Sequence, residues 1–220
     1  MKLAKFNEIG RSMVEMLGVL AIIGVLSVGA IAGYSKAMFK YKMNKTLDVL
    51  SHVITRVTEL STMNVGDPDN LGTAQYMIDY GFVSECEPGT IDENLCKLPV
   101  AEFQVVLYEQ PEFWGWLNLV FDKEPFDSCV AFLNSGLHKN VPEEWWSYDC
   151  PSEDYCMTGG FIVVSNDEDN VYTYGTSSYW KTEGAKSELN NTNILEMCSP
   201  CQNQKLCYLV WHFNIHAEAF

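Results

Sequence analysis

One apolar stretch constrains this chain more than any other feature. Between Glu15 and Lys36 lie 20 residues without a charged side chain, MLGVLAIIGVLSVGAIAGYS. As an α-helix these residues would extend about 30 Å, which matches the hydrocarbon thickness of a bilayer. The stretch therefore predicts a transmembrane helix over about residues 14–35.

The helical pattern continues beyond the apolar stretch. From Phe39 to Leu60 apolar residues recur at spacings of three and four, and no proline occurs between residues 11 and 63. Gly66 and Pro68 then follow as stop signals. We expect one long helix over residues 11–63, with a membrane half first and an amphipathic half afterwards.

The remaining residues, 70–220, have the pattern of a globular α+β head. Aromatic and β-branched residues predict strands over 101–109 and 114–121, a hairpin over 159–175 and a final strand in LCYLVWHFNIHAEAF, residues 206–220. The first two runs are separated only by QPEF and the third is a hairpin around an acidic turn, so the expected sheet is antiparallel.

Charge is distributed unevenly along the chain. Of 29 acidic residues only Glu8 and Glu15 precede residue 46, whereas seven of the 14 basic residues do. Residues 46–220 therefore carry 27 acidic and seven basic side chains, a net charge near −20. Such a head repels phosphate backbones, so we expect no nucleic-acid partner.

All cysteines lie beyond the apolar stretch. An even number confined to one domain indicates disulfides formed in an oxidising compartment. The short separations favour Cys86–Cys96 and Cys150–Cys156 as local loops, although eight cysteines allow 105 pairings and the spacing does not select among them. The candidates are Cys86, Cys96, Cys129, Cys150, Cys156, Cys198, Cys201 and Cys207.

Two general interpretations of the amino-terminal stretch compete. A secretory signal cleaved after Ala32, at Ala30-Ile31-Ala32, would release a disulfide-rich binding protein beginning at Gly33. However, the apolar run exceeds the usual 7–15 residues and has Glu15 at its entrance. An uncleaved membrane anchor explains the length but not the carboxylate.

The segment GRSMVEMLGVLAIIGVLSVGAIAGY, residues 10–34, resembles the amino-terminal signature of type IV prepilins and of type II secretion pseudopilins, and the resemblance covers about residues 1–60. It implies a leader peptide, residues 1–10, that prepilin peptidase removes by cutting after Gly10. Arg11 then becomes the amino terminus, where N-methylation would occur. The chain departs from the family at two points, with Arg11 where Phe is usual and Ile31-Ala32-Gly33-Tyr34 where a helix-kinking Pro is common.

The resemblance also implies a fold, a location and partners. The fold would be pilin-like, with a disulfide-stapled antiparallel head. The protein would cross the inner membrane once with its head in the periplasm and then enter a pilus or a pseudopilus, a choice that stays open. Its partners would be prepilin peptidase, inner-membrane lipid and other pilin or pseudopilin subunits in a helical filament. In that filament Glu15 would neutralise the amino terminus of an adjoining subunit.

Glu15 also has a simpler interpretation. A carboxylate in the first turns of a helix is stabilised by the helix dipole, and one at the membrane interface can remain hydrated. Residue type alone slightly favours this simpler interpretation over a role in assembly. The combination with Gly10 and the polar leader favours assembly.

Three further groups of residues suggest chemistry. Cys198-Ser-Pro-Cys201 has the spacing of a thiol–disulfide enzyme, which would make the chain a membrane-tethered redox protein, but its place near Cys207 favours a structural crosslink. His212 and His216 could join these cysteines around zinc, yet on a strand the two histidines would lie about 13 Å apart. The chain offers no convincing catalytic pair or phosphate loop, so we expect neither enzymatic activity nor a cofactor.

The last group is acidic. Asp167, Glu168 and Asp169 in SNDEDN are a weak calcium candidate, because carboxylates suit Ca²⁺ but the Gly and terminal Glu of an EF-hand loop are missing. A solvated hairpin turn rich in Asn and Asp is the preferred explanation, so we expect no metal site.

Overall fold

The structure is a computed structural model, and it describes residues 7–63, 73–108, 114–139, 161–166, 171–175 and 189–214. The chain divides into two compact units, Met1–Lys42 and Met43–Phe220. In the described residues the first unit is helical, and the second holds the strands and the shorter helices. Helix α1 (Asn7–Thr62) contributes residues to both units.

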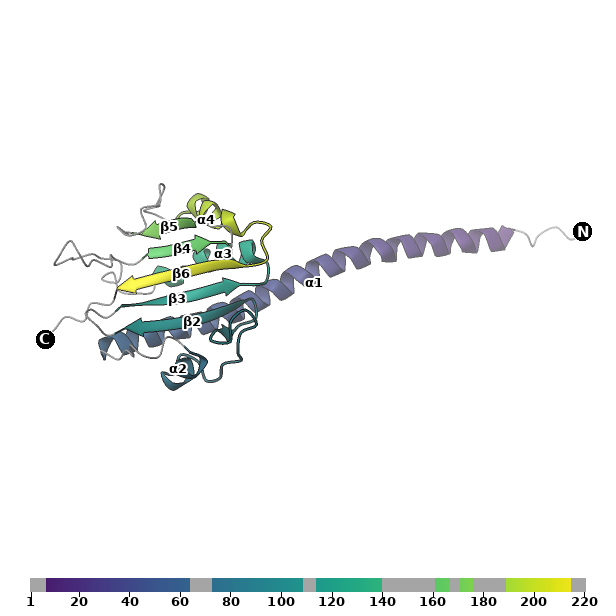
Figure 1. The fold of residues 1–220 in the computed structure, drawn as a ribbon. Helices are drawn as coiled ribbons and strands as arrows, with labels where there is room; N and C mark the ends of the chain where they lie inside the picture. The colour runs from purple at the N-terminus through teal and green to yellow at the C-terminus, as the bar shows by residue number, and fades with distance from the viewer. Residues whose placement is uncertain are drawn as a thin grey trace, which may run out of the picture. The chain divides into compact units, whose positions relative to one another are not determined.

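Helix α1 confirms the long amino-terminal helix (Figure 1). It has 56 residues and no internal break, as the absence of proline predicts. It begins at Asn7, so its backbone includes the end of the expected leader peptide. It ends at Thr62, and the predicted stop signals at Gly66 and Pro68 lie outside the described residues.

The second unit contains an antiparallel sheet of six strands in the order β1-β2-β3-β6-β4-β5 (Figure 1). The two predicted strands, the hairpin and the final strand are all present, and together with α1 they confirm an α+β class. The strands are β1 (Cys96–Lys97), β2 (Ala101–Tyr108), β3 (Trp114–Phe121), β4 (Phe161–Ser165), β5 (Val171–Gly175) and β6 (Cys207–Asn214).

The position of β6 could not be predicted from the sequence. Strand β6 lies between the two hairpins, because it pairs with all eight residues of β3 on one side and with β4 on the other. It therefore joins β2–β3 and β4–β5 into one sheet. The short helices α2 (Ala74–Asp79), α3 (Pro125–Asn134) and α4 (Asn191–Met197) were also not predicted, nor were the 3₁₀ turns η1 (Leu137–Lys139) and η3 (Ser199–Cys201).

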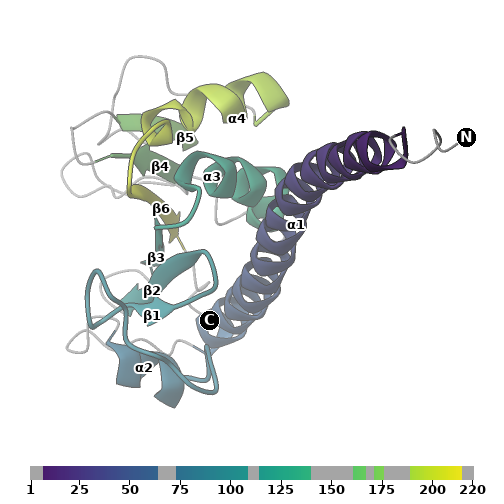
Figure 2. The ribbon, with the colours of Figure 1, turned by 90° about the vertical axis from the view of Figure 1, so that its right-hand side faces the viewer.

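One face of the sheet packs against helices. Figures 1 and 2 show the second-unit part of α1 and α3 on the same side of the sheet. Alternate strand residues point to this side, and the cross-strand row Val105–Leu117–Trp211–Ile162 is only 0–1% exposed. Each such side chain contributes about 1.5–3 kcal/mol through burial. The predicted amphipathic stripe of α1 supplies the opposing surface, with Met43, Leu50, Val53, Ile54, Val57 and Leu60 buried.

Arg56 fastens the end of α1 to the segment that follows α2. Its Nε donates a hydrogen bond to the carbonyl oxygen of Tyr80 at 2.8 Å, and its Nη1 lies 2.9 Å from Oε2 of Glu59. The chain turns at Gly81, whose φ of +73° favours glycine, and Arg56 Nε lies near the place where a Cβ would be. One guanidinium therefore fixes the position of this turn on α1.

Glu102 on β2 is a buried carboxylate that holds the loop preceding β1. Its Oε1 accepts hydrogen bonds from the backbone N–H and Oγ1 of Thr90, both at 2.6 Å, and its Oε2 accepts one from the N–H of Ile91 at 3.0 Å. Gly89 passes so close that an added Cβ would collide with Glu102 Oε2. The Cys86–Cys96 disulfide closes the same loop, so a covalent bond and a buried charge hold it together.

The surroundings of Glu102 affect its pKa in two opposite ways. Burial raises the pKa of the carboxyl, because the charged form loses water. The hydrogen bonds from Thr90 and Ile91 stabilise that charged form and lower the pKa by more, so it lies below its ordinary value of 4.5.

We expect Glu102→Gln to lower the free energy of unfolding by about 1–3 kcal/mol at neutral pH, because an amide NH₂ would face N–H donors. The folded pKa is lowered, so the carboxylate stabilises the fold above the unfolded pKa of about 4.5 and ceases to do so as the pH falls through the folded pKa. The difference between wild type and variant should therefore shrink in acid.

Urea unfolding of the full chain in detergent, followed by circular dichroism at several pH values, measures this difference. Glu87→Gln is the matched control, because Glu87 is exposed and contacts Lys97 at 3.3 Å on the surface. A Glu102→Gln effect that is equal at every pH would show that the charge of Glu102 does not hold the loop.

Candidate functional site

The first part of α1 presents apolar side chains around its whole circumference. Between Met13 and Tyr34, 13 large apolar side chains are exposed by 53–75%. Water does not favour a helix that is apolar on every side, whereas hydrocarbon does. By length and composition this helix could cross a membrane.

The serine side chains inside this segment form hydrogen bonds to the backbone of the same helix. Ser27 Oγ donates to the carbonyl oxygen of Ile23 at 2.7 Å, and Ser35 Oγ donates to that of Ile31 at 3.1 Å. Such bonds to the preceding turn remove the need for water, which a helix in hydrocarbon cannot obtain. The segment is therefore compatible with lipid in its hydrogen bonding as well as in its composition.

The residues of the prepilin resemblance all lie on α1. Gly10 and Arg11 belong to the helical backbone, but their side-chain surroundings fall outside the described residues. The Glu15 side chain is exposed, about one turn beyond Arg11. The helix passes through Ala30, Ala32 and Gly33 without interruption, so the alternative signal cleavage site is helical.

Four cysteines form two neighbouring disulfides in the second unit. Cys129 on α3 bonds Cys198 at the end of α4, and Cys201 on η3 bonds Cys207 at the start of β6. All four are buried, and the sulfur atoms of Cys129, Cys201 and Cys207 lie within 4.8 Å of one another. We call these four residues the cysteine cluster.

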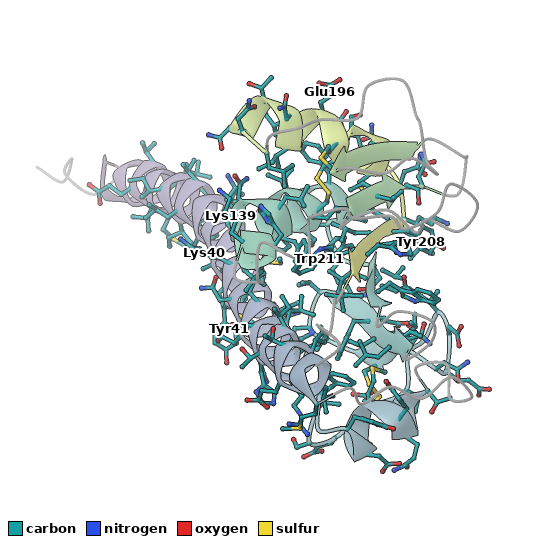
Figure 3. The ribbon with its side chains drawn as sticks, turned by 90° about the vertical axis from the view of Figure 1, so that its left-hand side faces the viewer. Lys40, Tyr41, Lys139, Glu196, Tyr208 and Trp211 are labelled. Atoms are coloured by element: carbon teal, nitrogen blue, oxygen red, sulfur yellow. A yellow bond between two sulfur atoms is a disulfide. The ribbon has the colours of Figure 1, made fainter. Side chains whose placement is uncertain are left out.

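A buried hydrogen bond adds a further element to the cysteine cluster. Nδ2 of Asn166, directly after β4, donates to the carbonyl oxygen of Pro200 at 3.0 Å. The turn between Cys198 and Cys201 is therefore fastened to α3, β6 and the end of β4. Figure 3 shows disulfides of this unit as yellow bonds.

The cluster does not have the pairing of a thiol–disulfide enzyme. Such an enzyme joins the two cysteines of its C-x-x-C motif to each other and exposes one of them. Here Cys198 and Cys201 are bonded to different partners and are 0–1% exposed. The pairing supports the structural interpretation of this motif.

The alternative zinc site also finds no support in the described residues. The cysteine sulfurs are held in disulfides, whereas zinc binds the thiolate. His212 points to the opposite face of the sheet from Cys207, because strand side chains alternate. His212 instead packs on the Trp116 ring, with centroids 5.6 Å apart, and burial lowers the pKa of His212 to about 4. His216 lies outside the described residues.

Other predicted site residues divide between described and undescribed parts of the chain. The structure contains the Cys86–Cys96 bond that the spacing favoured. Cys150 and Cys156 lie outside the described residues, as do the calcium candidates Asp167, Glu168 and Asp169. The pairing of Cys129 with Cys198 was not predicted, because 69 residues separate them and no local signal relates them.

The class that these features define is a chain with a helix able to span a membrane and a disulfide-bonded antiparallel α+β head. The chain matches no protein-family model, no curated protein and no solved structure. Its function must therefore be inferred from its own residues.

We expect the two disulfides of the cysteine cluster to contribute unequally to stability. In the chain-entropy description a crosslink that closes a loop of 69 residues contributes about 4 kcal/mol, and one that closes six residues about 2 kcal/mol. Replacing Cys129 and Cys198 together by alanine should therefore lower the urea midpoint more than replacing Cys201 and Cys207 together. The two pairs are equally buried and serve as controls for each other. Equal midpoints would mean that loop closure does not set their contribution.

Proposed function

We propose that this protein is a structural subunit of a type IV pilus or of a type II secretion pseudopilus. The main support for this proposal is that the two parts of α1 suit two different surroundings. Its first part is apolar and exposed on all sides, and the part from Met43 onward supplies the core of an antiparallel head. A helix of this kind holds the subunit in a bilayer and can later pack against the same helix of other subunits.

The proposed mechanism begins with insertion into the inner membrane. The leader stays in the cytoplasm and the head reaches the periplasm, where disulfides form. Prepilin peptidase then cuts after Gly10 and leaves Arg11 as the new amino terminus. The helix is already formed on both sides of this bond, from Asn7 onward, so the cut shortens α1 without requiring it to fold again.

Glu15 acts at the next step. A carboxylate in hydrocarbon costs a few kcal/mol unless a cation accompanies it. The ammonium group that cleavage creates at Arg11 of an adjoining subunit is such a cation. Pairing Glu15 with it fixes one axial offset between neighbouring helices, which is what a helical filament requires. Filament formation then releases the apolar segment from lipid into a bundle of identical segments.

Two other functions have less support. The secreted binding protein would discard the apolar segment after Ala32. The hydrogen bond of Ser27 within that segment and the carboxylate of Glu15 at its start would then have no role in the mature protein. The thiol–disulfide enzyme would need Cys198 and Cys201 to act as a pair, and the described disulfides pair them with other cysteines.

The mature amino terminus separates these functions. We expect the protein purified from cells with a prepilin peptidase to begin at Arg11, with or without one added methyl group, because Gly10 has the position of the leader's last residue. Intact mass and terminal sequencing measure it, and Gly10→Ala, which alters only the cut site, provides the uncleaved control. A product that begins at Gly33 would exclude the filament mechanism.

We also expect Glu15→Ala to abolish incorporation into filaments while the head remains folded. The substitution removes the proposed partner of the Arg11 ammonium group, but it lies outside the second unit. Shear fractions measure incorporation, and protease resistance of the oxidised head measures folding. Glu8→Ala is the matched control, because cleavage removes Glu8 from the mature chain. Normal incorporation of the Glu15→Ala protein would refute this role for Glu15.

A further inference from the structure

Three lysines follow the apolar segment within the first unit: Lys36, Lys40 and Lys42. We call them the lysine collar. All three side chains are exposed, and Figure 3 shows Lys40 on the surface of α1. The collar is the densest group of positive charge after residue 11, in a chain whose net charge is −15.

The collar lysines have no acidic side chain three or four positions away on their own helix. Acidic side chains stabilise a helical lysine from three or four positions away, and no acidic residue occurs between Glu15 and Asp48. None of the three lysines forms an ion pair with any residue that the structure describes. By contrast, Arg56, Lys97 and Lys123 in the second unit are each paired with a nearby carboxylate, at 2.7–3.3 Å.

The collar lies at the depth of lipid headgroups if the apolar segment spans a bilayer. Lys36 follows directly after Ser35, the last residue of the uncharged stretch, and Lys42 lies about 9 Å further along the helix axis. The headgroup region is roughly 5–8 Å thick on each side, and charges act over a Debye length of about 8 Å beyond it. All three ammonium groups are therefore within reach of lipid phosphates.

The directions of the side chains favour a partner that surrounds the helix. At 3.6 residues per turn, Lys40 points about 40° from Lys36, and Lys42 points about 120° away on the other side. Tyr41 and Tyr34, exposed by 63% and 67%, fill the remaining side. Tyrosine is common at membrane interfaces, where its ring is apolar and its hydroxyl is hydrated. A flat layer of headgroups meets all these side chains at once, whereas a second protein would meet one side.

We propose that the lysine collar binds anionic phospholipid headgroups in the leaflet next to the head. This inference rests on the membrane-spanning part of the proposed function. The collar gives the acidic chain a local attraction to a negative surface that its many carboxylates otherwise repel. It also holds the end of the apolar segment at one depth, because displacing α1 in either direction would move the ammonium groups away from phosphate.

The test compares lipids in contact with the full-length protein. The chain is reconstituted into phosphatidylcholine bilayers that contain spin-labelled phosphatidylglycerol or spin-labelled phosphatidylcholine, and electron paramagnetic resonance measures the fraction of each lipid immobilised by the protein. Attraction to one lysine corresponds to an enrichment of up to about fivefold for the lipid that contacts it. We expect phosphatidylglycerol to be enriched severalfold at low salt, and the enrichment to fall in roughly 0.5 M sodium chloride.

The variant with Lys36→Gln, Lys40→Gln and Lys42→Gln should lose most of this enrichment. The matched control carries Lys97→Gln, Lys123→Gln and Lys139→Gln, which changes the charge of the second unit by the same amount and should keep the wild-type preference. Equal loss in both variants, or an unchanged preference in the collar variant, would overturn the proposal. Loss of self-association by the collar variant with an unchanged lipid preference would also overturn it and would assign the collar to a second copy.

The same spectra distinguish this inference from the function on which it rests. If the wild-type protein immobilises both lipids equally, α1 spans the bilayer but the collar does not select headgroups, and only this proposal fails. If no immobilised component of either lipid is present, α1 does not span the bilayer, and the membrane part of the proposed function fails as well.

Discussion

The contact between α1 and the sheet is the interaction on which the head depends. The inner face of the sheet is apolar from β2 to β4, and a single antiparallel sheet cannot bury such a face by itself. The second-unit part of α1 and α3 cover it. The other stabilising features act on the periphery of this contact. Arg56 fixes a turn at the end of α1, Glu102 and Cys86–Cys96 hold the loop at one sheet edge, and the cysteine cluster ties the helices to β6.

One helix meets two requirements that are usually met by separate elements. Up to Tyr34 the helix is apolar on every side and therefore requires apolar surroundings. From Met43 onward only one stripe of side chains is buried, and the other side is polar. The change occurs across the basic residues that follow Ser35. The backbone needs no adjustment for it, since hydrogen bonds within a helix are equally satisfied in lipid and against a sheet. The environment of α1 is therefore set by side chains alone.

Local signals predicted the parts of this structure that local residues determine. The helix could be predicted because apolar spacing and the absence of proline extend over 50 residues. Strand β3 was predicted with its observed bounds because Trp114–Phe121 is β-prone and lies between QPEF and Asp122. The place of β6 and the Cys129–Cys198 bond were not visible, because both join segments that are far apart in the chain. Glu102 was not predicted either, since nothing about a lone Glu in a strand reveals that a loop will close over it. In the candidate site, Gly10, Arg11 and Glu15 came from a resemblance, and the contacts of Gly10 and Arg11 lie outside the described residues.

The central position of β6 restricts the order in which the head can fold. The hairpins β2–β3 and β4–β5 are each local and can form as soon as their own residues are available. They share no pairing, so they remain two separate ribbons until β6, which follows every other described strand in the chain, enters between them. If the head crosses a membrane after its amino-terminal helix, as we propose, its sheet would be completed only once β6 has emerged.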